Sequence, residues 1–108
     1  MDLYHTTDVD GISQINPTEE EMRSILRTLL DPEIEMEEHP SVSLTHDASG
    51  WSLSVYPNDV ISIENLDDDA DKFPEFLNNV SLEHALKLWG QLAEGQIAKI
   101  RTLDWQQN

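Results

Sequence analysis

Residues 41–66 read SVSLTHDASGWSLSVYPNDVISIENL and contain three consecutive runs in which apolar and polar side chains alternate. The apolar positions of these runs are Val42, Leu44, Trp51, Leu53, Val55, Ile61 and Ile63. A period of two is typical of antiparallel strands with one buried face. Turn-forming residues fill the two gaps, at 47–50 and 57–59. The stretch therefore predicts a three-stranded meander, with an apolar face to be covered and a Ser/Thr/Tyr face open to water.

A first amphipathic helix is predicted before the meander. Asn16 is the expected N-cap, Pro17 suits the first helical position, and Glu19 stands where a capping-box carboxylate belongs. Apolar residues then recur three and four positions apart, at Met22, Ile25, Leu26, Leu29 and Leu30. Because the residue before a proline avoids helical geometry, we expect this helix to span about 17–30 and to end before Pro32.

A second amphipathic helix is predicted over about 81–94. Ser81 is the expected N-cap, and Gly95 provides a left-handed stop. The apolar side of this helix consists of Leu82, Ala85, Leu86, Leu88, Trp89, Leu92 and Ala93. This broad stripe predicts the most buried helix of the chain.

Weaker patterns surround these elements. Residues 11–15 suggest one short strand that could join an edge of the meander. Residues 72–77 suggest an irregular or short helical segment, and residues 96–103 a short last helix. Trp105 is expected to dock back onto the body of the protein. The expected fold is a single α+β domain over residues 1–108, with an antiparallel meander of three to four strands and two to three helices packed on one face.

Several side chains are expected in the core between the helices and the meander. They are Leu26, Trp51, Leu53, Val55, Ile63, Leu86 and Trp89. All lie on the apolar faces of the predicted elements, so the helices and the strands can bury them against each other.

The net charge is extreme for a chain of this length. There are 22 acidic and 6 basic residues, which gives −16. Residues 1–71 hold eighteen acidic and two basic residues, whereas residues 72–108 hold four of each. Such a field repels nucleic acid and anionic membranes and attracts basic surfaces. Composition therefore favours a basic protein partner over nucleic acid or membrane, with simple solubility as the alternative explanation.

The sequence contains no recognisable catalytic or cofactor-binding motif. Without cysteine there is no disulfide, thiolate metal site or thiol nucleophile. None of the serines lies in a nucleophile motif, and there is no glycine-rich phosphate loop. His46 beside Asp47 suggests a hydrogen-bonded pair with a structural role rather than a general base. We therefore expect neither enzymatic activity nor a cofactor.

A calcium loop is the metal site that the sequence most nearly matches. Asp67, Asp69 and Asp71 have the spacing of its first ligands, but Lys72 and Asn78 stand where glycine and an acidic ligand are required. A solvated acidic loop is the expected structure, and weak calcium binding stays open. The N-terminus has neither the basic region nor the apolar region of a signal peptide, and no apolar run is long enough to span a membrane. We therefore expect a cytoplasmic location.

A set of packing residues resembles the small α+β immunity proteins of bacterial polymorphic toxin systems. The resemblance covers about residues 40–105. It rests on Gly50–Leu53, Pro57, Glu64–Leu66, Val80, Ser81, Ala85, Leu86, Leu88, Trp89, Asp104 and Trp105. It implies a cytoplasmic protein without catalytic residues that binds and blocks one cognate toxin, often an enzyme acting on nucleic acid or nucleotides. A DNA-mimic inhibitor of a defence or restriction nuclease and a non-inhibitory accessory domain are the alternatives.

Two acidic segments beside the strands are predicted to contact the basic partner. They span residues 31–38 and 64–75, and aromatic residues near them are the expected anchors. The predicted contact residues are Glu35, Glu37, Glu38, Tyr56, Glu64, Asp67, Asp68, Asp69, Asp71, Phe73 and Glu75. Phe76 is a further possible anchor, and a core position for Phe73 and Phe76 is the alternative.

Overall fold

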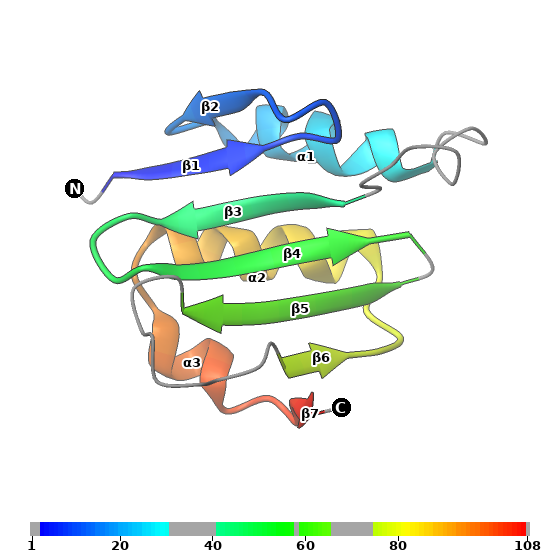
Figure 1. Cartoon of the computed structure of the whole chain (residues 1–108), viewed down its shortest axis with the longest axis vertical. Coiled ribbons are helices and arrows are strands. Elements are labelled where there is room, and N and C mark those ends of the chain that lie inside the picture. Colours follow the sequence, from blue (N-terminus) through cyan, green and yellow to red (C-terminus); the bar gives the residue numbers. More distant parts are fainter. Residues whose placement is uncertain (1–2, 31–40, 58, 66–74, 108) are drawn as a thin grey trace.

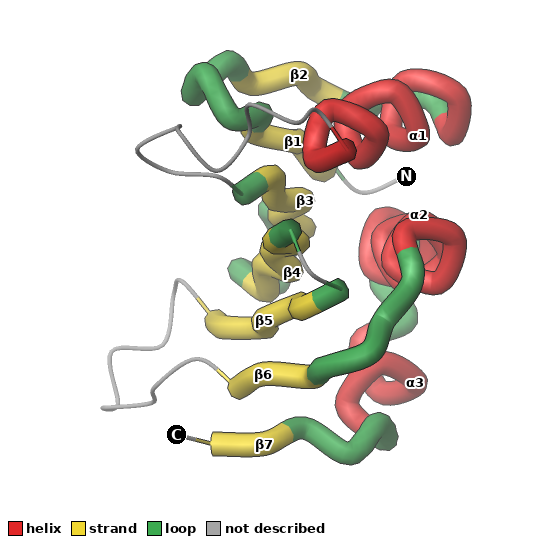
Figure 2. The backbone as a smooth tube through the Cα atoms, turned by 90° about the vertical axis from the view of Figure 1, so that its right-hand side faces the viewer, coloured by secondary structure: helices red, strands yellow, loops and turns green. Residues whose placement is uncertain are grey.

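The computed structural model describes residues 3–30, 41–57, 59–65 and 75–107. They form a seven-stranded antiparallel sheet, and its three helices all lie on one face (Figures 1 and 2). The predicted α+β fold with helices on one face is therefore confirmed. The predicted three to four strands were too few, because two short strands before the meander in sequence and two after it extend the sheet on both sides.

The sheet has the order β2-β1-β3-β4-β5-β6-β7, and every neighbouring pair is antiparallel. The strands are β1 (Tyr4–Thr7), β2 (Ser13–Ile15), β3 (Val42–His46), β4 (Trp51–Tyr56), β5 (Val60–Asn65), β6 (Glu75–Leu77) and β7 (Gln106–Gln107). The helices are α1 (Glu19–Arg27), α2 (Leu82–Ala93) and α3 (Ile97–Arg101), and a 3₁₀ turn, η1 (Thr28–Leu30), follows α1. Strands β3, β4 and β5 are the predicted meander.

The first two strands form a hairpin of which the sequence revealed only the second half. Strand β2 matches the predicted strand, whereas β1 was missed. The Asp8 carboxylate accepts hydrogen bonds from the backbone N–H groups of Asp10 and Ile12 and closes the turn. The residues of β1 that face the helices are Tyr4 and Thr6, so this strand lacks apolar alternation although all four of its residues pair with β3 at one edge of the meander.

Strand β6 corrects the prediction for residues 72–77. Glu75–Leu77, the described part of that segment, is a strand paired with β5 on one side and β7 on the other. Nothing in three residues of sequence distinguishes a strand from an irregular segment. The neighbouring edge of β5 supplies the hydrogen-bond partners, so the tertiary structure decides this conformation.

Helix α1 begins two positions later than predicted, and its cap is Thr18 rather than Asn16. The Thr18 hydroxyl accepts from the Glu21 N–H at 3.2 Å, and the Glu21 carboxylate accepts from the Thr18 N–H at 3.0 Å. This is a complete capping box. Asn16 instead has a positive φ of 49° and uses its side-chain oxygen to accept from the Tyr4 N–H. The cap prediction was wrong because the Asn16 side chain, just after β2, bonds instead to Tyr4 at the start of β1.

Helix α2 agrees with its prediction. Ser81 caps it by accepting from the His84 N–H at 3.2 Å, and Gly95 has the expected left-handed conformation, with a φ of 77°. Helix α3 is shorter than the predicted 96–103 segment. Trp105 docks as expected, since its indole N–H donates to the Ile100 carbonyl at 2.8 Å.

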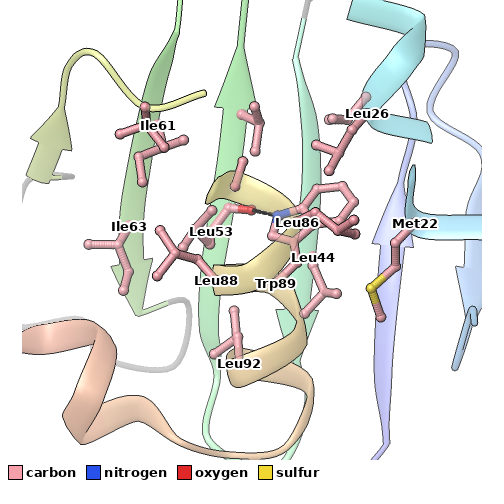
Figure 3. Close-up of a cluster of buried hydrophobic side chains, with 14 of the residues drawn as sticks. Met22, Leu26, Leu44, Leu53, Ile61, Ile63, Leu86, Leu88, Trp89 and Leu92 are labelled. Atoms are coloured by element: carbon pink, nitrogen blue, oxygen red, sulfur yellow. Dashed lines mark hydrogen bonds between the residues drawn. The ribbon is translucent and has the colours of Figure 1, made fainter. Parts of the chain in front are cut away.

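The core lies between the sheet and the helices, and Trp89 is at its centre (Figure 3). Trp89 is fully buried, and its indole N–H donates to the Leu53 carbonyl of the central strand β4 at 3.1 Å. Six of the seven predicted core residues are buried: Leu26, Leu53, Val55, Ile63, Leu86 and Trp89. Trp51 is the exception. It is half-buried at the end of β4, and the Arg101 guanidinium lies 5.2 Å from its ring centre.

Candidate partner-binding surface

Among residues 3–30, 41–57, 59–65 and 75–107, no helix lies on the face of the sheet opposite α1, α2 and α3 (Figure 2). Strand register assigns side chains to it. Leu44, Leu53 and Ile63 are paired across β3, β4 and β5 and point to the helices, so their neighbours in each strand point the other way. We call this second surface the open face. In β3–β5 it consists of Ser43, Thr45, Ser52, Ser54, Tyr56, Val60, Ser62 and Glu64.

Short hydroxyl side chains form the floor of the open face. One cross-strand row runs Ser13, Thr7, Ser43, Ser54, Ser62, Phe76 and Gln106, and a second runs Ile15, His5, Thr45, Ser52 and Glu64. The sequence predicted a Ser/Thr/Tyr face open to water. That prediction holds only in part, because Thr45, Ser52 and Ser62 are buried.

Cross-strand contacts account for the burial of these hydroxyls. Thr45 donates to the Ser52 hydroxyl at 3.0 Å. The Ser62 hydroxyl lies 3.5 Å from that of Tyr56, and Phe76 is paired directly with Ser62 in the register. Small side chains therefore lie below the tops of their longer neighbours, and the result is a shallow floor with taller residues around it.

Two predicted contact residues and one possible anchor lie together on this face. Tyr56 and Phe76 flank Ser62, and Glu64 is two residues further along β5. All three are half-buried, so each presents part of its surface to solvent. Phe76 lies on the face opposite the core, so the core alternative is wrong for this residue, and its role as an anchor stays a prediction.

Glu75 does not join this group. It is paired with Ile63 and therefore points to the helix side, where its carboxylate lies 2.8 Å from the Arg101 guanidinium. Arg101 also lies over the Trp51 ring, so Glu75 belongs to a contact that holds α3 against the sheet. Its carboxylate is occupied inside the protein.

Most of the predicted contact residues lie outside the described residues. These are Glu35, Glu37, Glu38, Asp67, Asp68, Asp69, Asp71 and Phe73. Segment 31–38 follows Leu30, at the end of η1, and the next described residue after it is Ser41, before β3. Segment 64–75 begins with Glu64 and Asn65 at the end of β5 and ends at Glu75, the first residue of β6. The register places Ser41 and Asn65 at opposite ends of β4, which is roughly 17–20 Å long for six residues.

The described basic residues lie in the helical layer of the molecule and not in the sheet. Among the described residues every Lys and Arg lies on a helix: Arg23, Arg27, Lys87, Lys99 and Arg101. No described strand contains either residue type. The described part of the open face thus has the carboxylate of Glu64, and that of Asp47 at the β3–β4 turn, without a neighbouring Lys or Arg on the same strands.

Asp47, at the β3–β4 turn, binds a different histidine from the one predicted. Asp47 binds His5 of β1, with an Nδ1–Oδ1 distance of 2.9 Å, and not the adjacent His46. The His46 side chain is buried, and its Nδ1 lies 2.7 Å from the Ser49 hydroxyl. Alternation along β3 puts the His46 side chain on the helix side, so sequence neighbours here have different partners. Across the described ranges, no cluster of three His, Asp or Glu has the geometry of a metal site.

Sequence reasoning missed exposed apolar residues near this corner of the open face. Ile15 of the edge strand β2 is 71% exposed and is paired with His5. Leu3, two residues before His5, is 58% exposed. The sequence showed them as apolar positions of a weak strand pattern, which could not distinguish an edge from a core position. Together with Tyr56 and Phe76, they place apolar groups at both sides of the hydroxyl floor.

Comparison with known proteins finds no family model, no curated protein and no solved structure that matches this chain. Among the described residues, no helix is long and apolar enough to cross a membrane.

Proposed function

We propose that this protein binds a basic protein partner through the open face of its sheet and neutralises that partner. The observation that carries the proposal combines three features. No helix of the described part of the chain covers this sheet face, Tyr56, Phe76 and Glu64 lie on it, and the described Lys and Arg residues are confined to the helices. The net charge of −16 provides the long-range attraction to such a partner. This function corresponds to an immunity protein that blocks a toxin acting on nucleic acid or nucleotides.

Anchors and charges have different tasks in this proposal. Aromatic side chains at the centre of an interface supply most of the binding energy once they are desolvated. Rim carboxylates mainly accelerate association and select the partner. Tyr56 and Phe76 would serve as anchors, and the serine floor would allow close approach of the partner. The carboxylates of the acidic segments 31–38 and 64–75, except that of Glu75, would steer it.

A DNA-mimic inhibitor is the less favoured reading. Such a protein needs carboxylates spaced like phosphates over one extended face. The described part of the open face instead carries mainly hydroxyls, with Glu64 and the turn residue Asp47 as its carboxylates. A partner with a mixed apolar and basic surface fits these residues better than a phosphate-binding cleft alone.

The test captures the partner and then asks which face holds it. The immobilised protein is exposed to a lysate of its source organism, and a captured protein is identified by mass spectrometry and tested for growth inhibition that co-expression relieves. Tyr56→Ser with Phe76→Ser should weaken binding at least tenfold through faster dissociation. Replacing Asp67, Asp68, Asp69 and Asp71 by Asn should slow association, as should raising the salt concentration from low to physiological strength.

A control variant separates face from charge. Glu20→Gln removes one carboxylate from an exposed position of α1 on the helix side. It should change the association rate less than Glu64→Gln, which removes one from the open face. A partner whose association ignores salt and whose dissociation ignores the Tyr56 and Phe76 variants, at unchanged thermal stability, would refute the proposal.

A further inference from the structure

A hollow lies between α1 and α2, on the helix side of the sheet. Its volume is about 840 Å³, within the range of sites that enclose small ligands or inserted side chains. Its apolar walls are Tyr4, Pro17, Met22, Leu86, Gly90 and Ala93, and its polar ones are Thr18, Glu19, Lys87, Gln91 and Glu94. The hollow is thus bounded by the start of α1 and the end of α2, and it lies on the helix side of the sheet, opposite the open face.

Gly90 gives this hollow an unusual wall. It stands inside the twelve-residue helix α2, where glycine destabilises a helix relative to alanine. The fold itself does not require it, because a Cβ at Gly90 would meet no other part of the chain within 4 Å. Its left-handed conformations are not used either, since only Gly11, Gly50 and Gly95 among the described glycines have positive φ. The missing side chain leaves room for close approach from outside.

The charges around the hollow favour a cation. Glu94 caps the C-terminus of α2, the negative end of the helix dipole, and the last turn of α2 has no basic residue to offset it. Glu19 lines the same hollow from α1. Lys87 is the single cation among the lining residues. Glu83, four residues before it, has its carboxylate 3.8 Å from the guanidinium of Arg23, which lies outside the lining. The lining thus holds two carboxylates and one lysine.

We propose that the α1–α2 hollow is a docking site for a segment of a protein partner that presents an apolar side chain next to a lysine or arginine. The apolar group packs on Met22, Leu86 and the backbone of Gly90. The cationic group lies at the rim near Glu19 and Glu94. This site is separate from the open face and does not depend on the function proposed for it.

The test uses three small probes with the same apolar body: 4-phenylbutylammonium, 4-phenylbutanol and 5-phenylpentanoate. Each is titrated into the ¹⁵N-labelled full chain and followed by amide chemical shifts. The ammonium probe should shift the signals of Gly90, Gln91 and Glu94 and bind most tightly, and the carboxylate probe should bind most weakly. Glu94→Gln and Glu19→Gln should each weaken the ammonium probe about two- to fivefold, as expected for exposed ion pairs. Glu20→Gln, in the same turn of α1 but outside the lining, should not.

Filling the hollow gives an independent result. Gly90→Leu should abolish the shifts while the protein stays as thermally stable as the wild type or becomes more so, because leucine favours a helix over glycine. Ser24→Leu adds the same side chain at an exposed position of α1 outside the hollow and should leave binding unchanged. Equal affinity for all three probes, shifts confined to other residues, or binding that survives Gly90→Leu would overturn the proposal. Concentration-dependent shifts of Gly90 without any probe would also overturn it, by assigning the hollow to a second copy of the chain.

Discussion

Ser52 and Leu53 are adjacent in β4 and belong to the two different faces of the sheet. Leu53 is fully buried against the helices, and its carbonyl accepts from the Trp89 indole. Ser52 is buried among other hydroxyls on the open face, where it accepts from Thr45. Burial of a large apolar side chain stabilises by about 1.5–3 kcal/mol, whereas a neutral hydrogen bond contributes only about 0.5–1.5 kcal/mol. The helix-covered face therefore supplies stability, and the open face can vary in composition at lower cost.

The largest expected effect tests this division directly. Leu53→Ala should lower the free energy of unfolding by about 2–5 kcal/mol, through lost apolar burial and the remaining cavity. Ser52→Ala should lower it by only about 1–2 kcal/mol, chiefly because Thr45 loses its acceptor in a buried position. Urea denaturation of both variants measures the difference. Similar losses from the two substitutions would show that both faces contribute equally to stability.

The next effect concerns the hydrogen bond that joins the two layers. Trp89→Phe keeps an aromatic ring in the core but removes the indole N–H that donates to Leu53. We expect a loss of about 1–3 kcal/mol from the hydrogen bond and the smaller ring together. Trp105→Phe is the matched control, because it removes a similar indole–carbonyl bond from a half-buried site at the chain terminus. Trp105→Phe should lower the free energy of unfolding by less than Trp89→Phe. An equal loss would show that the central position of Trp89 does not increase its contribution to stability.

The smallest effect is a pH dependence at the start of α1. The pKa of Glu21 is lowered from its usual value of 4.5, chiefly by a hydrogen bond from the Thr18 backbone N–H. Hydrogen bonds from the side chains of Thr18 and Gln14 lower it further. A carboxyl with a lowered folded-state pKa stabilises the protein above its unfolded-state pKa, and this contribution is lost as the pH falls through the folded-state value. The thermal stability of the wild type should therefore exceed that of Glu21→Gln at pH 7, and the difference should shrink below about pH 4.5.

The exposed neighbour Glu20 provides the control for this measurement. All carboxyls other than the substituted one are present in both the wild type and the variant. The difference in thermal stability between the two proteins therefore reports the substituted residue alone. Glu20→Gln should show a smaller change with pH than Glu21→Gln, since Glu20 takes no part in the capping box. A Glu21 difference that stays constant down to pH 3 would show that the carboxylate does not hold the cap.

The sequence by itself determined the elements whose signals are local and repeated. Alternation over 41–66 predicted β3, β4 and β5, because a strand with one buried face must place apolar residues at every second position. Ser81, Gly95 and the apolar stripe between them predicted α2 and its burial for the same kind of reason. The charge of −16 also follows from composition alone and predicts an overall field that repels nucleic acid.

Only the tertiary structure decided the remaining strands and the partners of individual polar groups. Tyr4–Thr7 and Glu75–Leu77 are strands because free edges of the meander pair with them, and a short segment carries no signal of an edge that is distant in sequence. Asn16 lost the helix cap to Thr18, and Asp47 found His5 instead of His46, since pairing across strands brings groups together that sequence spacing separates. The open face and the α1–α2 hollow have the same origin. Alternation showed which residues share a face, but only the tertiary structure showed that all three described helices pack on the same face of the sheet.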